Sequence, residues 1–199
     1  MASIREVNAI NRRRSQADPA YGLSAQHRFA DGDTITAATN FGTPGYLLLP
    51  VTFRVDVEVT TLATATGVLF EIGDATTGVA LVLDGGDLIC AAGGQGNDGA
   101  DGTATSLFGA DGHRRSLVFS ILPGTGQVQV HADGALVIDE TAVAGVFTSW
   151  AANADGEVGD VDTAITARVA APLRVALANA AVVGEIVVYP SQLPRTFRR

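Results

Sequence analysis

The stretch "TFRVDVEVTT", residues 52–61, alternates strictly between apolar and polar side chains. The apolar positions are Phe53, Val55, Val57 and Val59, and the polar positions between them are Arg54, Asp56, Glu58 and Thr60. Because successive side chains of a strand point to opposite faces, this pattern predicts a strand with one face on an apolar core and the other in water. Half-buried strands of this kind are typical of antiparallel sheets.

Short strands of similar length recur on both sides of this stretch. The runs are "GVLFEIG", "GVALVLDGG", "DLICAAGG", "HRRSLVFSIL", "GQVQVHADGALVID", "LRVALA" and "VVGEIVVYP". Glycine-rich turns separate them, and helical periodicity is scarce after about residue 29. This organisation predicts an all-β fold, an antiparallel β-sandwich of the jelly-roll type.

An Asp-Gly pair inside "GQVQVHADGALVIDE", residues 126–140, predicts a β-hairpin. A loop of Asp133-Gly134 alone mixes polar and apolar residues on both faces, whereas a loop of Ala132–Gly134 separates them. The preferred register pairs Val130 with Leu136 and Val128 with Ile138. It predicts that His131 lies on the outer, water-facing side with Gln129, as a surface histidine rather than an acid-base catalyst.

The first 28 residues differ from the rest and predict an arm ahead of a sandwich domain at residues 29–199. Ser3 and Glu6 fit a capping box at the start of a short helix. The apolar stripe of that helix is Ile4, Val7 and Ile10, and a basic cluster of Arg12, Arg13 and Arg14 follows it. Isolated helices this short are marginal in water. The arm is therefore either a frayed terminus or a helical or extended segment that orders on a partner.

Composition narrows the classes of partner. The chain has 199 residues, enough for one domain with a sizeable core, and its formal charge of -8 argues against nucleic acid. Neither a bilayer-spanning apolar run nor the apolar block of a secretory signal is present, which predicts no membrane partner and synthesis in the cytosol. The single cysteine, Cys90, reads as a small apolar strand residue.

The order of several short motifs resembles a known family. A strand ending in Ile-Gly-Asp, a Leu-Asp-Gly-Gly turn, an Asp-Gly hairpin tip and a closing Gly-Glu-Ile strand follow one another within residues 41–190. This order is similar to the laminin-G-like branch of the concanavalin A-like lectin and glucanase superfamily. The resemblance implies a jelly roll of two curved antiparallel sheets. It leaves function open, because the fold hosts lectins, glycan hydrolases, adhesion modules and virion proteins.

Two groups of acidic residues are candidates for catalysis. Asp56 and Glu58 lie two positions apart on one strand, which places them about 6.5–7 Å apart, near the spacing of glycosidase carboxylates. Alternate charged residues are also the ordinary signature of a solvated sheet face, and this interpretation is preferred. The stretch "GEVGDVD" contains Glu157, Asp160 and Asp162, but its spacing departs from the glucanase pattern of the family. We therefore predict no catalytic residues and no enzyme.

The remaining candidates concern binding. Trp150, the sole tryptophan, is the first candidate for contact with a glycan, together with His131 and Gln129. The glycine-rich loop from residue 93 opens as Gly-Gly-x-Gly-x-Asp, and its Asn97, Asp98 and Asp101 offer oxygen ligands for calcium. A mobile loop is preferred because the motif is a single incomplete copy. The resemblance adds Asp74 as a conceivable calcium ligand at a sheet edge, and no other cofactor is expected.

These observations favour a non-catalytic recognition or structural protein. The leading hypothesis is a decoration protein of a phage or phage-like virion, made in the host cytoplasm, that docks on other virion proteins through its arm as a homo-oligomer. The alternative is a carbohydrate-binding module or adhesin that contacts a glycan on a host surface, from the bacterial cytoplasm or from the cell surface after export without a signal peptide. A glycan hydrolase is the third possibility.

Overall fold

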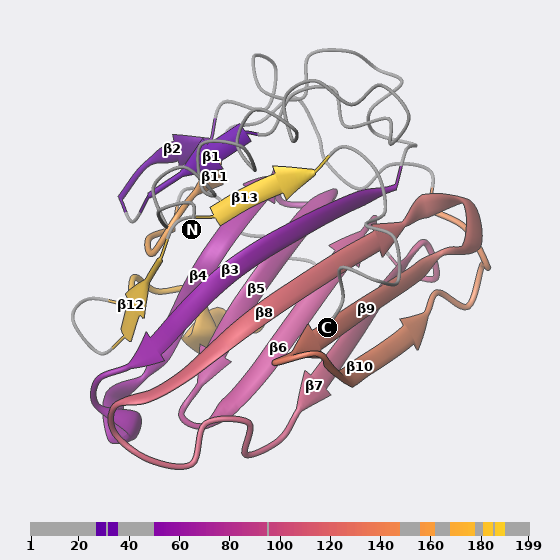
Figure 1. The fold of residues 1–199 in the computed structure, drawn as a ribbon. Coiled ribbons are helices and arrows are strands. Elements are labelled where there is room, and N and C mark those ends of the chain that lie inside the picture. Colours follow the sequence, from indigo (N-terminus) through magenta and orange to yellow (C-terminus); the bar gives the residue numbers. More distant parts are fainter. Residues whose placement is uncertain are drawn as a thin grey trace, which may run out of the picture.

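The computed structural model describes residues 27–30, 32–35, 50–94, 96–147, 156–161, 168–177, 181–184 and 186–189. Within these residues the regular secondary structure is almost entirely β-strand, arranged mainly as two antiparallel sheets that face each other (Figure 1). The predicted all-β sandwich is thereby confirmed. No helix among these residues has the length and hydropathy needed to cross a membrane.

The larger sheet has seven strands in the order β1-β13-β3-β8-β9-β10, with β12 also paired to β3. Its strands are β1 (His27–Phe29), β3 (Val51–Val59), β8 (His113–Leu122), β9 (Gln127–Ala132), β10 (Ala135–Thr141), β12 (Ala181–Val183) and β13 (Ile186–Tyr189). The longest pairing joins β3 and β8, with Asp56 opposite Ser116 and Glu58 opposite Arg114. Strand β1 begins at His27, just before the predicted start of the sandwich domain.

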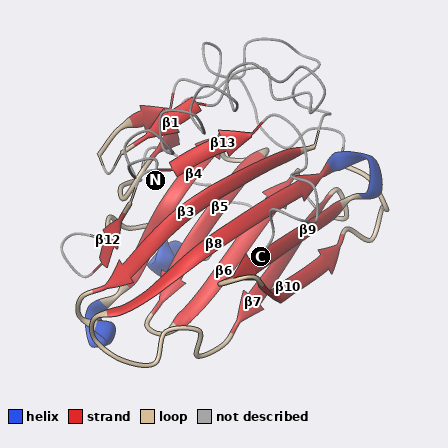
Figure 2. Ribbon diagram, in the orientation of Figure 1, coloured by secondary structure: helices blue, strands red, loops and turns tan. Residues whose placement is uncertain are grey.

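The smaller sheet lies behind the larger one in Figure 1 and has the order β4-β5-β6-β7. Its strands are β4 (Thr66–Gly73), β5 (Gly78–Asp84), β6 (Asp87–Gly93) and β7 (Gly99–Ala104). A separate short ladder pairs β2 (Thr34–Ile35) with β11 (Gly156–Glu157). In the described part of the chain, single-turn 3-10 helices connect strands or cover them (Figure 2): η3 (Leu62–Thr64), η4 (Pro123–Thr125) and η5 (Ala171–Leu173).

The core between the two sheets follows from the alternation in β3. Its apolar positions are buried and its polar positions Arg54 and Asp56 are exposed, as the sequence predicts. Phe53 of β3 and Phe119 of β8 meet Phe70 of β4 across the interface, with ring centroids 4.9 to 6.1 Å apart. Tilted aromatic contacts at these distances add to the stabilisation that burial provides.

A second apolar cluster covers the other face of the smaller sheet. Val68, Ala80, Val82 and Ala91 pack there against Val169. The segment of residues 168–177 carries Val169 and is held by backbone hydrogen bonds, from the Val68 amide to the Val175 carbonyl and from the Leu177 amide to the Gly159 carbonyl. This segment therefore takes most of the outer face of β4, β5 and β6 away from water.

The two sheets approach closely along the flank where β7 faces β10. A β-carbon at Gly102 would collide with the Ile138 side chain and would lie 2.8 Å from the Glu140 Cγ. Only glycine leaves room for β10 at this position, so the flank of the sandwich is closed by direct contact between the edge strands.

The hairpin at residues 126–140 forms at the predicted place but in a different register. Ala132 lies opposite Ala135, so the loop is Asp133-Gly134, with both residues in the left-handed region at φ 49° and 85°. The predicted three-residue loop is wrong. A bulge between Leu136 and Ile138 then shifts the pairing, which brings Ile138 opposite Val130 on the core face. The polar and apolar side chains are therefore on separate faces, as predicted, but the bulge causes this separation and not a longer loop.

Candidate functional site

A cleft of about 420 Å³ opens where the ends of several strands and turns of the larger sheet meet. Asp56 and Glu58 come from β3, and Arg114, Arg115 and Ser116 come from the start of β8. The other lining residues are Val57 of β3, Asp133 at the β9–β10 tip and Gly184 between β12 and β13. None of these residues is aromatic. The cleft brings charges of both signs together from segments far apart in the sequence.

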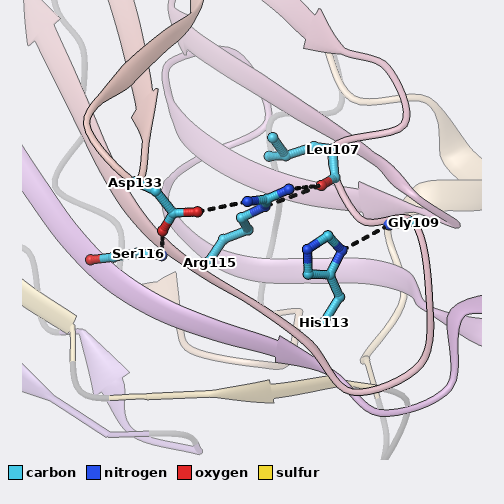
Figure 3. Close-up of polar contacts among 6 residues, drawn as sticks. All are labelled: Leu107, Gly109, His113, Arg115, Ser116 and Asp133. Carbon is cyan, nitrogen blue, oxygen red and sulfur yellow. Dashed lines mark hydrogen bonds and ion pairs between the residues drawn. The ribbon is translucent and has the colours of Figure 1, made fainter.

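One wall of the cleft is a fixed network around Arg115 (Figure 3). Its guanidinium donates from Nε and Nη2 to the Leu107 carbonyl, at 3.2 Å each, and from Nη1 to the Asp133 carboxylate at 2.7 Å. The second oxygen of Asp133 accepts the Ser116 amide at 2.9 Å, and the Asp133 amide donates back to the Ser116 carbonyl. Five hydrogen bonds therefore lock the hairpin tip to the start of β8 and to the β7–β8 loop.

This network also shifts the acidity of its carboxylate. The Ser116 amide first, and then the Arg115 guanidinium, lower the pKa of Asp133 from its usual value. Asp133 stays ionised to more acidic pH than an ordinary aspartate. The ion pair is partly exposed, with 29% of the Arg115 side chain and 46% of the Asp133 side chain open to solvent.

His113 extends the same wall but lies outside the cleft lining. Its Nδ1 accepts the Gly109 amide at 3.0 Å, and its ring meets Phe108 edge-on with centroids 6.2 Å apart. Figure 3 shows that His113 and Arg115 both point toward the β7–β8 loop. The role that the structure gives His113 is to position this loop.

The other wall carries the acidic pair singled out from the sequence. Glu58 forms an ion pair with Arg114 at 2.6 Å, and the Arg114 side chain is 77% exposed. Asp56 lies opposite Ser116, and the part of the chain that the structure describes offers no hydrogen bond or ion pair to its carboxylate. The Gly184 amide donates to the Asp56 backbone carbonyl at 2.7 Å, which sets the floor of the cleft beside this carboxylate.

The residues predicted to contact a glycan do not gather here. His131 lies on the face opposite to the core, as predicted, but it is only 9% exposed rather than open to water, and its cross-strand neighbours are Val118 and Leu136. Gln129 donates to the Asp139 carboxylate at 3.2 Å. Trp150 lies outside the described residues.

The predicted docking residues of the arm also lie outside the described residues. They are Ile4, Val7, Ile10, Arg12, Arg13 and Arg14. The virion-docking hypothesis depends on them, so it stays a prediction, as does the homo-oligomer.

The glycine-rich loop binds the guanidinium of Arg168, which comes from another segment of the chain. The Arg168 guanidinium, in a side chain only 6% exposed, donates to the Asp101 carboxylate at 2.8 Å and to the carbonyls of Gly94 and Gly96 at 2.5 and 2.6 Å. It lies flat against Gly99, where a β-carbon would collide with it. The main-chain oxygens and the carboxylate that a calcium ion would use therefore already face a positive charge.

Arg168 therefore already neutralises Asp101, one of the three predicted calcium ligands, and calcium binding stays a prediction. Among the described residues no cluster of three or more His, Cys, Asp or Glu side chains is arranged to hold a metal. Asp74, the other candidate ligand, instead closes the β4–β5 turn by accepting the Thr76 amide and hydroxyl and the Thr77 amide, at 2.7 to 2.9 Å. Burial acts to raise the pKa of Asp74, but these hydrogen bonds outweigh it and the net shift is downward.

The acids of "GEVGDVD" do not form a site in the described residues. Glu157 is part of the short β11 strand and lies opposite Thr34, and the Asp160 carboxylate accepts the amide of the next residue, Val161. Asp162 lies outside the described residues. Neither Glu157 nor Asp160 is among the described residues that line the cleft.

Neither Arg115 nor Arg168 was among the site residues predicted from the sequence. Their partners Asp133 and Asp101 lie 18 and 67 residues away, and no local motif links the members of either pair. The weak signal for Arg115 was its place in "HRRS" at the start of a strand, ahead of an Asp-Gly tip.

Two facing antiparallel sheets give the described residues the jelly-roll sandwich fold predicted above, and the solved structures that match the chain share this fold. No family model and no curated protein matches the sequence significantly. Among solved structures, the carbohydrate-binding module CBM40 of the Ruminococcus gnavus IT-sialidase matches with a TM-score of 0.56 and 13% identity, over 87% of this chain and 94% of that one. The same module bound to α2,3-sialyllactose matches with a TM-score of 0.55.

Other similar structures are parts of larger proteins. Domains LG4-5 of the mouse laminin α1 chain match with a TM-score of 0.61 and 17% identity, over 90% of this chain and 46% of that one. The Trypanosoma rangeli sialidase matches with a TM-score of 0.57 and 16% identity, over 86% of this chain but only 26% of the enzyme. At these identities the likeness establishes the fold alone.

Proposed function

We propose that this chain is a non-catalytic carbohydrate-binding module that holds a sugar in the cleft between Asp56 and Asp133. The cleft itself carries the proposal, because Arg115 and Asp133 are held by several hydrogen bonds while Asp56 and the Ser116 hydroxyl are left without a partner in the described part of the chain. Similar modules that bind sialyllactose lend support through the shared fold.

The chemistry of the cleft suits sugar hydroxyl groups, which donate and accept hydrogen bonds. The Asp56 carboxylate accepts only, the exposed Arg114 guanidinium donates only, and the Ser116 hydroxyl does both. Neighbouring acceptors and donors of this kind match the vicinal hydroxyls of a pyranose. Because the described residues that line the cleft include no aromatic ring, we expect binding to depend on hydrogen bonds and to be weak, with a Kd of about 0.1–1 mM.

The arrangement of the acids favours binding over hydrolysis. Two-carboxylate glycosidases aim both groups at one glycosidic bond. In this cleft Glu58 is instead engaged by Arg114 at 2.6 Å, and Asp133 is engaged by Arg115 and the Ser116 amide. Asp56 is thus left as a single acceptor without a catalytic partner.

Replacing Asp56 by Ala tests the proposal on a panel of neutral, amino and acidic oligosaccharides. The native chain is expected to bind at least one class in calorimetric titration, and D56A is expected to lose at least about tenfold in affinity, since one charge-assisted hydrogen bond disappears. The melting temperature is expected to stay unchanged, because Asp56 is exposed and makes no side-chain bond.

Asp84→Ala provides the matched control, because Asp84 is an equally exposed aspartate at the end of β5 in the other sheet. This variant is expected to bind like the native chain. Native affinity in D56A, or no binding of any sugar by the native chain, would refute the proposed site.

A further inference from the structure

The balance of charge inside the cleft points to a kind of sugar. Among the described residues that line the cleft, three carboxylates, those of Asp56, Glu58 and Asp133, face two guanidinium groups, those of Arg114 and Arg115. Each guanidinium is already paired, Arg114 with Glu58 at 2.6 Å and Arg115 with Asp133 at 2.7 Å. One negative charge is left over, and it lies on Asp56.

An acidic sugar would enter this cleft at a disadvantage. Its carboxylate would approach the unpaired Asp56, and the charges of the two guanidinium groups that it could reach are already neutralised by Glu58 and Asp133. Arg115 is the harder of the two to free, because the Leu107 carbonyl holds it as well. The formal charge of -8 on the whole chain adds a longer-range repulsion of anions.

A cationic sugar meets the opposite situation. An ammonium group beside Asp56 would form a charge-assisted hydrogen bond and leave both existing ion pairs intact. The Ser116 hydroxyl lies directly across the strand pair and can accept from the same group or from a neighbouring hydroxyl. Gly184 lies close against Asp56, because a β-carbon at this position would come within 3.0 Å of the Asp56 carbonyl oxygen and 3.4 Å of the Asp56 Cβ, so a larger residue here would crowd the cleft beside Asp56.

We propose that the cleft takes a cationic amino sugar, a hexosamine with a free amine, and discriminates against acidic sugars. This inference rests on the proposed function and names the ligand class of the same site. It sets this chain apart from the similar module that binds sialyllactose.

The test compares three probes at mildly acidic pH and low salt: a tetramer of β1,4-linked glucosamine, its fully N-acetylated counterpart, and α2,3-sialyllactose. The native chain is expected to bind the amine tetramer about tenfold more tightly than the acetylated one and to bind sialyllactose least. Asp56→Asn keeps the size and hydrogen-bonding capacity of the side chain but removes its charge. D56N is expected to bind both tetramers alike, at close to the native affinity for the acetylated one.

Asp84→Asn controls for attraction by the net charge alone, because it removes one carboxylate away from the cleft. D84N is expected to keep the tenfold preference. An amine preference that survives in D56N, or that falls equally in D84N, overturns the inference. Tighter binding of sialyllactose or of the acetylated tetramer by the native chain also overturns it but leaves the proposed function standing. Failure of all three probes to bind, as on the wider panel above, counts against the proposed function itself.

Discussion

Two regions of the molecule use the same residue types, aspartate and arginine, to opposite ends. In the glycine-rich loop Arg168 is buried and makes three hydrogen bonds, to Asp101 and to two carbonyls. In the cleft Arg114 is 77% exposed and makes one ion pair, and Asp56 has no partner in the described residues. In the first region the guanidinium is fully engaged in hydrogen bonds within the protein, and these bonds stabilise the fold. The second keeps bonding capacity that a ligand can use.

The difference shows that residue type alone does not decide what a charged side chain does. A buried side chain with all its hydrogen bonds made stabilises the fold, whereas an exposed one with hydrogen-bonding groups to spare can bind a ligand. A buried charge must be fully paired or it destabilises the fold, whereas an exposed pair contributes little to stability and remains open to exchange. Variants in the two regions should therefore respond on different scales.

Arg168→Ala is expected to have the largest effect. It removes a buried guanidinium and strands the carbonyls of Gly94 and Gly96, so the free energy of unfolding should fall by about 2–4 kcal/mol in urea titrations. Arg114→Ala is the matched control and should cost less than about 0.5 kcal/mol. Equal losses of unfolding free energy in the two variants would contradict the distinction between a stabilising arginine and an exposed one.

Asp133→Asn is expected to have an intermediate, pH-dependent effect. The pKa of Asp133 is lowered in the folded chain, so its contribution is present above the unfolded pKa of about 3.9 and is lost as pH falls through the lower folded value. Asparagine keeps the left-handed turn at this position.

At neutral pH D133N should be less stable than the native chain by about 0.5–1 kcal/mol, a figure reduced for the exposure of the pair. The difference should close as the solution is acidified well below pH 4. Thermal melts of both chains across this range measure the difference, and a constant gap would mean that the Asp133 charge is not the cause.

Calcium is expected to have the smallest effect. With Arg168 in place, millimolar calcium should leave the melting temperature of the native chain unchanged, because a ligand stabilises only by binding the folded state. Magnesium serves as the control for ionic strength. A rise specific to calcium would instead support the metal site predicted from Asn97, Asp98 and Asp101.

The sequence was sufficient for those features that depend on local alternation. The period of two in residues 52–61 predicted β3 with the correct face toward the core, and Asp133-Gly134 marked the hairpin tip. The loop length was wrong because we assumed that only the loop sets which face is buried. A bulge after Leu136 also changes which face of the strand is buried, and no residue type in this stretch predicts that bulge.

The charged sites could not be predicted in the same way, because their members meet only through the topology. Asp56 and Glu58 were visible as alternate acids, but the pairing of Glu58 with Arg114, which leaves Asp56 alone, depends on the antiparallel register of β3 with β8. Arg168 had no local signal at all, since the Gly94 carbonyl that it binds lies 74 residues earlier in the chain.

The position of β13 bears on how the protein is made. This strand, the last one described, pairs with β1 on one side and with β3 on the other. During translation β1 and β3 leave the ribosome long before their shared neighbour exists, so the larger sheet stays open along that line until synthesis has passed Tyr189. We expect nascent chains that stop short of β13 to expose unpaired strand edges and to depend on chaperones until it arrives.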